Sequence, residues 1–381
     1  MRIGAIRMDC KQQLAELREQ IDAIDGRMVP LFCERMDASR RVAGVKAKGN
    51  MPILDEERER QVAERAVSCA DEALHGETEL FMRSVMAIAR GHQNKFLYRG
   101  EASLLPQKRP PVTGEITCAF QGVPGAWSEQ ALMKIFPDAN RQAVEFFEDV
   151  FLAVKEGRAD YGVVAIENSK TGAIGETYDL LRKYGCFIVG RTAVDIHHCL
   201  LAPEGTCLSD IREVLSHPEG FKQCSGFLRG RAWNLTACRN TAVAAEMAAK
   251  ASGGRTAAIG SRRAAELSGL RVLAPDIMDR ADNRTSFVVI SSAPEYDAAS
   301  SLVTVTFSTA HRSGALCETL LPFMAHGINL MRIESRPAGF GKYRFFAELE
   351  GNVDAPEMLA AMRQAAATCE YFEVIGCYGN I

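Results

Sequence analysis

The stretch LAELREQIDAIDGRMVPLFCERMDASRRVAGVK, residues 14–46, decides the fold of the N-terminal part of this chain. Apolar residues recur in it at spacings of three and four, the period of an amphipathic helix. They are Leu14, Leu17, Ile21, Ile24, Met28, Leu31, Ala38, Val42 and Val45. A helix this long with so narrow an apolar stripe is not stable alone. We therefore expect it to pack on other helices, from this chain or from a second chain.

Basic residues lie on or near this stripe. Arg35 comes four residues after Leu31, where the pattern calls for an apolar residue. Lys46 lies only about 20° around the helix from Arg35, so the two cations share one inward face. Arg18 lies roughly 100° away from Arg35 and suits a different pocket, such as one in a partner subunit. Buried cations need anionic partners, and an anionic ligand can supply them.

Two shorter helices are expected next. Pro52 ends the long helix, Asp55 has the residue type of an N-cap, and a third helix is expected from about Glu77 to Tyr98. Residues 8–99 are thus predicted to form a helical domain. Residues 100–114, with three prolines, are predicted to be a linker.

The pattern changes after this segment. Short β-rich runs alternate with helical stretches, which predicts an α/β domain over residues 115–292. The segment SSAPEYDAAS has the composition of a second linker. After it, the order strand, helix, strand, strand, helix, strand predicts a ferredoxin-like βαββαβ domain over residues 300–381. The fold class is therefore multidomain.

Composition excludes several functional classes. A net charge of −3 offers no basic surface for nucleic acid or an anionic membrane. There is no run of about 18 apolar residues for a transmembrane helix, and no signal peptide is recognisable. The 12 cysteines include no C-x-x-C pair and are expected to be reduced, so we expect a cytoplasmic protein.

No metal or cofactor is expected. His197 and His198 precede Cys199, but adjacent strand residues point to opposite faces, which is poor metal geometry. We expect them to pack within a strand, and His217, before Pro218, to lie in a turn.

Polar residues follow several strands of the α/β region. Ser128 opens a helix whose free N–H groups can hold a carboxylate, and Thr241 opens another. Asn168 and Ser169 follow a buried strand, and Thr285 begins a late one. Taken alone, an N-cap role is the simpler explanation of Ser128 and Thr241.

Taken together, these segments resemble a known family. LAELREQIDAID, ERMDASRRVAGVK, PILDEERER and the Gln of ARGHQ are similar to the all-helical chorismate mutases. FQGVPGAWSE, ADYGVVAIENS, DIHHCLLA, SHPEGFKQC and the Asn-x-Thr-x-Phe at 283–287 resemble prephenate dehydratases. The chain as a whole resembles the bifunctional enzymes of phenylalanine biosynthesis. This implies a two-lobed dehydratase like a periplasmic binding protein, followed by an ACT regulatory domain.

The resemblance implies three sets of site residues. The mutase set is Arg18, Arg35, Lys46, Asp55, Arg58, Glu59 and Gln93. The dehydratase set is Ser128, Asn168, Ser169, Thr241 and Thr285. The motifs GALC and ESRP imply a phenylalanine effector site with Gly314, Ala315, Leu316, Glu334, Ser335, Arg336 and Pro337.

The implied chemistry needs no nucleophile and no metal. Chorismate rearranges within one molecule, so arginines clamp its carboxylates while Lys46 and Gln93 donate to the breaking ether oxygen. Glu59 would hold the substrate hydroxyl. Prephenate loses a hydroxyl and a carboxylate together, and Thr285 would donate to the departing hydroxyl.

Two positions depart from the family pattern. Ala89 stands where the family has a small hydroxyl residue, and one lost hydrogen bond costs about 0.5–1.5 kcal/mol. Ser286 stands where the family has arginine. Because residues two apart in a strand share a face, we hypothesise that Arg284 supplies the missing cation.

Two other interpretations stay open. The chain can be a monofunctional dehydratase whose helical arm only dimerises, although such an arm needs no cations on its inner face. It can also be a non-catalytic two-lobed binding protein, a class that is usually exported. The preferred interpretation has chorismate and prephenate as substrates, phenylalanine as effector, and a homodimer or larger homo-oligomer as the assembly.

Overall fold

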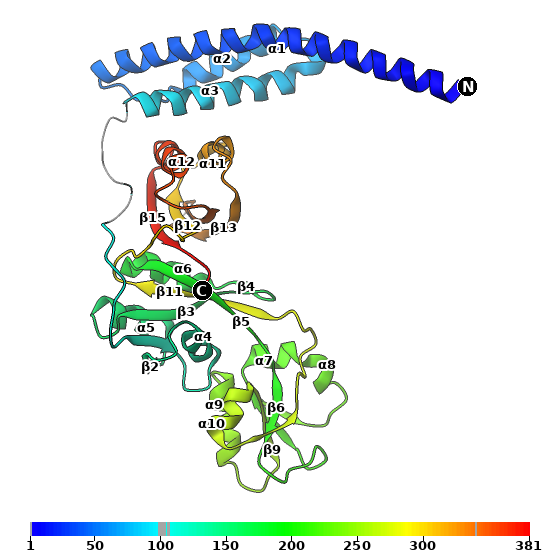
Figure 1. Ribbon diagram of the computed structural model, residues 1–381, viewed down its shortest axis with the longest axis vertical. Helices are drawn as coiled ribbons and strands as arrows, with labels where there is room; N and C mark the ends of the chain where they lie inside the picture. The colour runs from blue at the N-terminus through cyan, green and yellow to red at the C-terminus, as the bar shows by residue number, and fades with distance from the viewer. Residues whose placement is uncertain (1, 98–103, 105–106, 340) are drawn as a thin grey trace. The chain divides into compact units, whose positions relative to one another are not determined.

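The computed structural model describes residues 2–97, 104, 107–339 and 341–381 (Figure 1). By internal contacts the chain divides into two units. One contains the three N-terminal helices together with residues 313–322 and 361–368, and the other contains the two β-sheets. The predicted architectures are all present: a helical region, an α/β region with two sheets, and a C-terminal βαββαβ order.

The N-terminal unit contains α1 (Arg2–Lys48), α2 (Glu56–Ser68) and α3 (His75–Leu97), with a short 3₁₀ helix, η1 (Glu72–Leu74), before α3. α1 ends before Pro52, as predicted. Asp55 caps α2, since its side chain accepts a hydrogen bond from the Arg58 N–H at 3.0 Å. α3 packs against both other helices, and a small buried cluster that includes Met36 and Val85 joins α1 to α3.

The N-terminal half of α1 carries its apolar stripe on the surface. The stripe residues are between 46% and 64% exposed: Leu14, Leu17, Ile21, Ile24, Met28 and Leu31. Apolar side chains at this spacing normally pack against another helix. Within the described part of the chain, nothing buries them. No described helix combines the length and the apolar character that crossing a bilayer requires.

The larger sheet of the second unit has ten strands. They are β1 (Thr117–Gln121), β2 (Asn140–Val144), β3 (Tyr161–Asn168), β4 (Gly172–Ala173), β5 (Phe187–Asp195), β11 (Arg284–Ser291), β12 (Leu302–Ser308), β13 (Leu330–Pro337), β14 (Tyr343–Glu350) and β15 (Tyr371–Tyr378). Their order is β13-β14-β12-β15-β5-β11-β3-β1-β2, with β4 paired to β3. The helices α4 (Trp127–Ile135), α5 (Phe147–Lys155) and α6 (Gly175–Tyr184) pack on its strands β1, β3 and β5.

The smaller sheet forms the second lobe of the α/β region. Its strands are β6 (Cys199–Ala202), β7 (Glu213–Ser216), β8 (Asn234–Ala237), β9 (Thr256–Gly260) and β10 (Arg271–Ala274), and its helices are α7 (Pro218–Gln223), α8 (Ser225–Leu228), α9 (Thr241–Lys250) and α10 (Arg262–Ser268). The chain enters this lobe after β5 and returns at β11. Because β11 lies between β5 and β3, the returning chain comes to lie beside the end of β3.

The C-terminal region continues the larger sheet. Its two helices are α11 (Ala315–Ala325) and α12 (Pro356–Ala366). β15 pairs in parallel with β5, where Gly376 lies opposite Ile188 and a side-chain carbon at 376 would come within 2.7 Å of Ile188 O. One hydrophobic core crosses this junction and includes Tyr178 and Ile188 together with Phe346 and Tyr378.

The two segments with linker composition are packed against each other in their described parts. The Arg109 N–H donates to Pro294 O at 3.0 Å, and the Arg109 guanidinium pairs with Glu295 at 2.8 Å. Glu295 is buried and also accepts from the Tyr161 hydroxyl at 2.7 Å. Composition predicted linkers here, and polar partners distant in sequence hold the described parts of both segments.

Candidate active sites

The three N-terminal helices bound a cavity of about 390 Å³. Six of the seven side chains predicted for the first site line it: Arg35, Lys46, Asp55, Arg58, Glu59 and Gln93. α1 supplies the first two, the start of α2 the next three, and α3 the last. The seventh, Arg18, is not among the lining residues and lies on the exposed half of α1.

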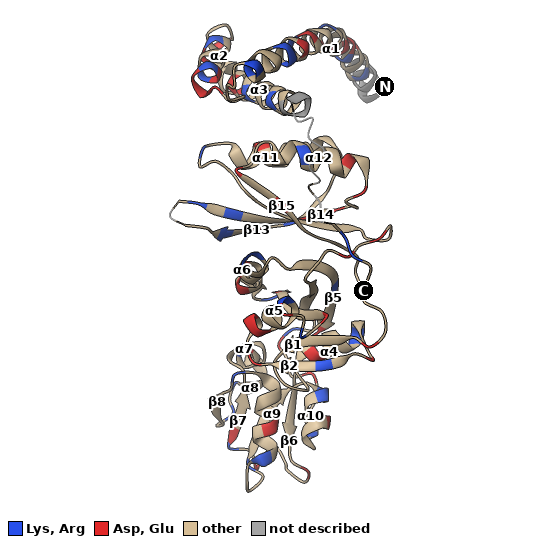
Figure 2. Cartoon of the chain, turned by 90° about the vertical axis from the view of Figure 1, so that its left-hand side faces the viewer, with Lys and Arg blue, Asp and Glu red and all other residues tan. Residues whose placement is uncertain are grey.

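The cavity holds more positive than negative charge. Four cationic residues and two acidic residues line it, a formal excess of two positive charges. Figure 2 shows how densely charged α1 and α2 are. Within the described residues, no carboxylate pairs with the guanidinium of Arg35 or Arg58. Lys46 Nζ donates to Ile53 O at 2.5 Å and keeps two further protons. A small dianion would balance this excess.

Sequence reasoning missed two polar lining residues, Arg90 and Ser39. Arg90 is buried, and its guanidinium donates to both carboxylate oxygens of Glu59. This pair fixes the orientation of Glu59, whose oxygens keep lone pairs for a ligand hydroxyl. A signal was available for both residues. Arg90 precedes Gln93 by three positions and Ser39 follows Arg35 by four, spacings that share a helix face.

A second group of polar side chains lies where β3 ends and β11 begins. Thr285 is the register partner of Asn168, and Asn168 Nδ2 donates to Thr285 Oγ1 at 2.9 Å. Asn168 Oδ1 accepts from the main-chain N–H groups of Lys170 and Thr171 at 2.9 and 3.2 Å, which fixes the orientation of the amide. Because Thr285 Oγ1 accepts from Asn168, its proton is left to donate to a ligand.

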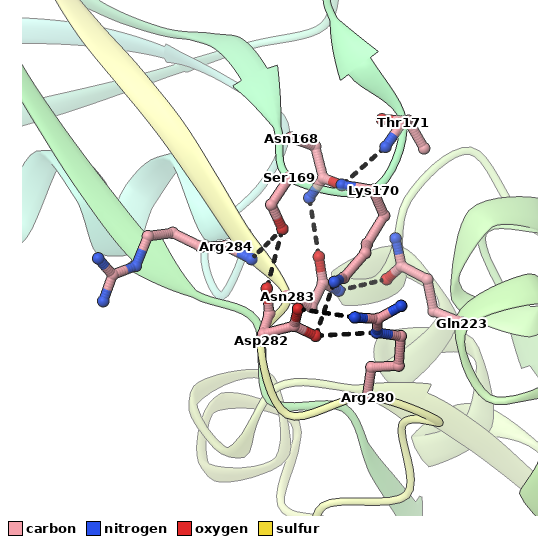
Figure 3. A network of polar contacts seen from close by, with 9 residues as sticks. All are labelled: Asn168, Ser169, Lys170, Thr171, Gln223, Arg280, Asp282, Asn283 and Arg284. Carbon is pink, nitrogen blue, oxygen red and sulfur yellow. Dashed lines mark hydrogen bonds and ion pairs between the residues drawn. The ribbon is translucent and has the colours of Figure 1, made fainter. Parts of the chain in front are cut away.

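A chain of hydrogen bonds extends from this pair into the smaller lobe (Figure 3). Asn168 Nδ2 also donates to Asn283 Oδ1 at 3.0 Å, and Asn283 Nδ2 donates to Gln223 Oε1 at 2.8 Å. His198 Nε2 lies 2.9 Å from the same Gln223 oxygen. Burial lowers the pKa of His198, so its neutral ring donates the Nε2 proton to Gln223. The side-chain amides of Asn168, Asn283 and Gln223 therefore each have one favoured orientation.

The turn before β11 is held by charged and main-chain contacts (Figure 3). Ser169 Oγ donates to Asp282 O and accepts from the Arg284 N–H, both at 3.0 Å. Hydrogen bonds from Lys170 and Arg280 lower the pKa of Asp282 to about 2, so this carboxylate stays ionised. The Ser169 hydroxyl thus forms its hydrogen bonds with the main chain of this turn.

Arg284 does not take the place of the arginine absent at Ser286. Its side chain is 60% exposed and pairs at 2.6 Å with Asp195, its register partner on β5. Figure 3 shows it directed away from Asn168. The cation near Ser286 is Arg191 of β5, whose Nη2 lies 3.5 Å from the Ser286 hydroxyl. The alternation of side chains along the strand suggested Arg284 for this role. Its ion pair with Asp195 on the neighbouring strand holds it elsewhere.

Neither Ser128 nor Thr241 is an N-cap. Ser128 lies in the first turn of α4, and its hydroxyl donates to Gln121 O. Asn240 caps α9, which leaves the Thr241 hydroxyl without a capping role. A side-chain carbon at Gly122 would lie 3.9 Å from Ser128 Oγ and 3.8 Å from Asn240 Nδ2. The loop before α4 and the start of α9 therefore approach each other across the two lobes.

The histidines have roles that sequence reasoning did not find. His197 and His198 lie between β5 and β6 rather than within a strand, and His197 Nδ1 lies 3.0 Å from Asp276 Oδ1. His217 caps α7 through its ring nitrogen rather than lying in a simple turn. Among the described residues, no group of three His, Cys, Asp or Glu side chains is arranged to hold a metal ion.

The residues predicted to bind an effector lie before and in the first turn of α11 and along β13. Gly314 precedes α11 with a φ of +79°, a conformation that favours glycine. Burial alternates along β13, so that Glu334 and Arg336 are half-buried while Ser335 is exposed. Arg336 Nη2 binds Asp179 Oδ2 of α6 at 2.7 Å. This ion pair connects one end of β13 to α6 of the α/β lobe.

Comparison with known proteins covers both sites. Residues 17–94 match the family described as chorismate mutase type II, and residues 118–295 match the prephenate dehydratase family. The bifunctional chorismate mutase/prephenate dehydratase of Escherichia coli (strain K12) is 33% identical and aligns over 97% of both chains. The Aquifex aeolicus (strain VF5) protein of the same name is 30% identical over 96% of this chain and 98% of its own. A solved prephenate dehydratase in complex with L-Phe from Arthrobacter aurescens is 30% identical, with a TM-score of 0.65 over 70% of this chain and 90% of that chain.

We predict that Asn283→Ala lowers the free energy of unfolding of the second unit by about 1–2 kcal/mol, because the buried amide of Asn168 and the half-buried amide of Gln223 each lose a partner. Urea unfolding followed by tryptophan fluorescence measures this, since both tryptophans, Trp127 and Trp233, lie in this unit. Asn140→Ala is the matched control. That exposed amide bonds only Glu115, and its loss should change stability by less than about 0.5 kcal/mol. Equal effects of the two variants would contradict a stabilising role for the hydrogen bonds that join Asn168, Asn283 and Gln223.

Proposed function

The chain belongs to the bifunctional chorismate mutase/prephenate dehydratase family, and on this basis we propose which side chains carry each step. It converts chorismate to prephenate and prephenate to phenylpyruvate, in phenylalanine biosynthesis. The similarity extends over the helical region as well as the α/β region, so the helices are more than a dimerisation arm. The non-catalytic alternative is likewise excluded. A cytoplasmic location stays a prediction of the sequence.

The excess of two positive charges in the helical cavity carries the assignment of the mutase site. Chorismate is a dicarboxylate, and Arg35 and Arg58 have no carboxylate partner in the described chain. Their planar guanidinium groups suit bidentate pairing with carboxylates. Lys46 and Gln93 donate to the ether oxygen, where negative charge develops as the bond breaks. Glu59, held by Arg90, accepts from the substrate hydroxyl.

Arg18 is assigned to the cavity of a second copy of the chain. It lies on the half of α1 whose apolar stripe is exposed, one position after Leu17. A homodimer in which two α1 helices pack along this stripe would bury it. Arg18 lies outside its own cavity, and the same packing would bring it toward the cavity of the partner. The exposed stripe and the absence of Arg18 from its own cavity support this assignment.

In the dehydratase step, Thr285 donates its proton to the departing hydroxyl. The carboxylate leaves as carbon dioxide, the electrons of its C–C bond enter the ring, the C–O bond breaks, and the hydroxyl leaves as water once it is protonated. Asn168 holds Thr285 with its proton directed outward. Thr241, in the first turn of α9, anchors a carboxylate with its hydroxyl. Ser128 donates to Gln121 O and so holds the start of α4 in place, where the helix N–H groups bind a carboxylate. Ser169 holds the turn in place.

Phenylalanine is proposed to bind at residues 314–316 and 334–337 and to inhibit the dehydratase. A network of ion pairs between the C-terminal strands and β3 supports this inhibition. Arg332 of β13 pairs with Glu167, and Arg191 of β5 lies 2.5 Å from Glu348 of β14 and 3.7 Å from Glu167. Glu167 immediately precedes Asn168 on β3 and points to the opposite face. A shift of β13 would therefore act on the residue next to Asn168.

We predict that Arg35→Ala and Thr285→Val each impair one activity and leave the other unchanged. Arg35→Ala should reduce kcat/KM for chorismate by about 10- to 100-fold, because a charged hydrogen bond is lost. Thr285→Val should reduce turnover of supplied prephenate by about 10²- to 10⁴-fold, because the proton donor is lost. Chorismate loss and phenylpyruvate formation are measured separately on each variant. Unchanged chorismate turnover in Arg35→Ala would sink the mutase assignment.

We further predict that Arg18→Ala and Arg35→Ala complement each other. Each variant alone should retain no more than about a tenth of the mutase activity. Mixing the two after dissociation should restore about a quarter of the sites, since a mixed dimer has one site with both arginines. An Arg18→Ala protein mixed with itself is the control. Failure to recover activity, with mixed dimers demonstrated, would place Arg18 outside the partner's site.

Finally, millimolar or lower phenylalanine should inhibit the dehydratase, and Gly314→Ala should raise the half-inhibitory concentration by about 10-fold. Gly327→Ala is the control, because Gly327 follows α11 with a similar φ of +68° and lies outside both motifs. Point variants are preferred to truncation, because removing residues 300–381 would expose the core shared with Tyr178. Calorimetry that detects no phenylalanine binding would defeat the proposal.

A further inference from the structure

Gln93 is only partly satisfied in the helical cavity. Its Nε2 donates to Ser39 Oγ at 2.6 Å, and both residues are 9% exposed. Its Oε1 is buried and has no hydrogen-bond partner in the described chain. A buried amide oxygen without a donor is costly. The side chain that the mutase chemistry requires as a donor to the ligand thus uses one of its two N–H groups within the protein and leaves its oxygen unpaired.

Ser39 occupies a particular place on the cavity wall. It follows Arg35 by four residues and precedes Lys46 by seven, and both spacings bring side chains to the same face of α1. All three residues line the cavity. No described acceptor receives the Ser39 proton. Ser39 therefore brings to the cavity wall a hydroxyl whose proton is available.

Turning the Gln93 amide by 180° about its last torsion satisfies both groups. Oε1 then faces the Ser39 hydroxyl, which donates to it, and Nε2 takes the place of the unpartnered oxygen. A ligand ether oxygen has lone pairs and no proton, so it can pair with Nε2 but is repelled by Oε1. Of the two orientations, only this one offers the ether oxygen a donor while leaving no buried amide atom of Gln93 unpaired.

The neighbouring position on α3 cannot provide this function. Ala89 precedes Gln93 by four residues, lines the cavity and is buried, but its methyl group forms no hydrogen bond. Among the lining residues, Ser39 is the one recorded in contact with the Gln93 side chain. The hydroxyl that orients this amide therefore comes from α1.

We propose that Ser39 is a positioning residue of the mutase reaction, whose hydroxyl donates to Gln93 Oε1 and holds Nε2 toward the ether oxygen of chorismate. This rests on the proposed role of Gln93 as a donor to that oxygen. Ser39 itself does not touch the reacting atoms. Its effect is on kcat, because the ether oxygen gains charge in the transition state.

A double-mutant cycle on the full-length protein tests the proposal. Ser39→Ala should lower kcat for chorismate by about 3- to 10-fold with little change in KM, the size expected for one hydrogen bond. Ser39→Thr, which keeps the hydroxyl, should retain most of the activity. In a Gln93→Ala background, Ser39→Ala should cause no further loss. Ser84→Ala is the matched control, since Ser84 is exposed and bonds only to Leu80 O of its own helix.

The outcomes distinguish the role of Ser39 from that of Gln93. If Gln93→Ala leaves chorismate turnover unchanged, the proposed role of Gln93 is wrong, and the role of Ser39 with it. If Gln93→Ala is impaired but Ser39→Ala matches the wild type, or its effect adds fully to that of Gln93→Ala, only the positioning role is overturned. Helical circular dichroism and dehydratase turnover should not change in Ser39→Ala. A loss of either, shared by Ser39→Thr, would assign Ser39 to folding instead.

Discussion

The antiparallel pairing of β11 with β3 is the interaction on which the second unit depends. β11 is the strand by which the chain returns from the smaller lobe, and it enters the larger sheet between β3 and β5. Only in this register does Thr285 lie opposite Asn168. Because successive strand residues alternate between faces, the same register puts Glu167 and Ser286 on the reverse side, near Arg191. One pairing thus positions the polar site and its link to the C-terminal strands.

The two sites solve a common physical problem. Neither reaction requires a nucleophile from the protein, so each site has to present donors in a fixed direction. In each, a second hydrogen bond fixes a group that we propose to meet the ligand. Main-chain N–H groups of Lys170 and Thr171 fix Asn168, and Arg90 fixes Glu59. The helical cavity adds an uncompensated positive charge, which suits an anionic substrate better than a neutral one.

The C-terminal strands are a structural part of the α/β lobe. Tyr378 is buried in the core that contains Tyr178, and its hydroxyl lies 2.8 Å from Glu348 and 2.7 Å from Thr304. Burial raises the pKa of Tyr378 well above its usual value, so the phenol stays protonated and able to donate. A C-terminal region that shares a sheet and a core with this lobe can transmit strain to it without a flexible connection.

The sequence by itself determined the order of helices and strands, the Asp55 cap and six of the side chains that line the helical cavity, because spacing along a helix is a local property. It did not determine the partners. Arg90 bound to Glu59, Ser39 against Gln93, and the relay through Asn283 and Gln223 join residues that are distant in the chain. Arg284 illustrates the difference, since its face in the strand was predictable from the pleat but the carboxylate of Asp195 that holds it was not. Tertiary structure decided these contacts, because a side chain bonds to the group that the fold brings within about 3 Å of it, wherever that group lies in the sequence.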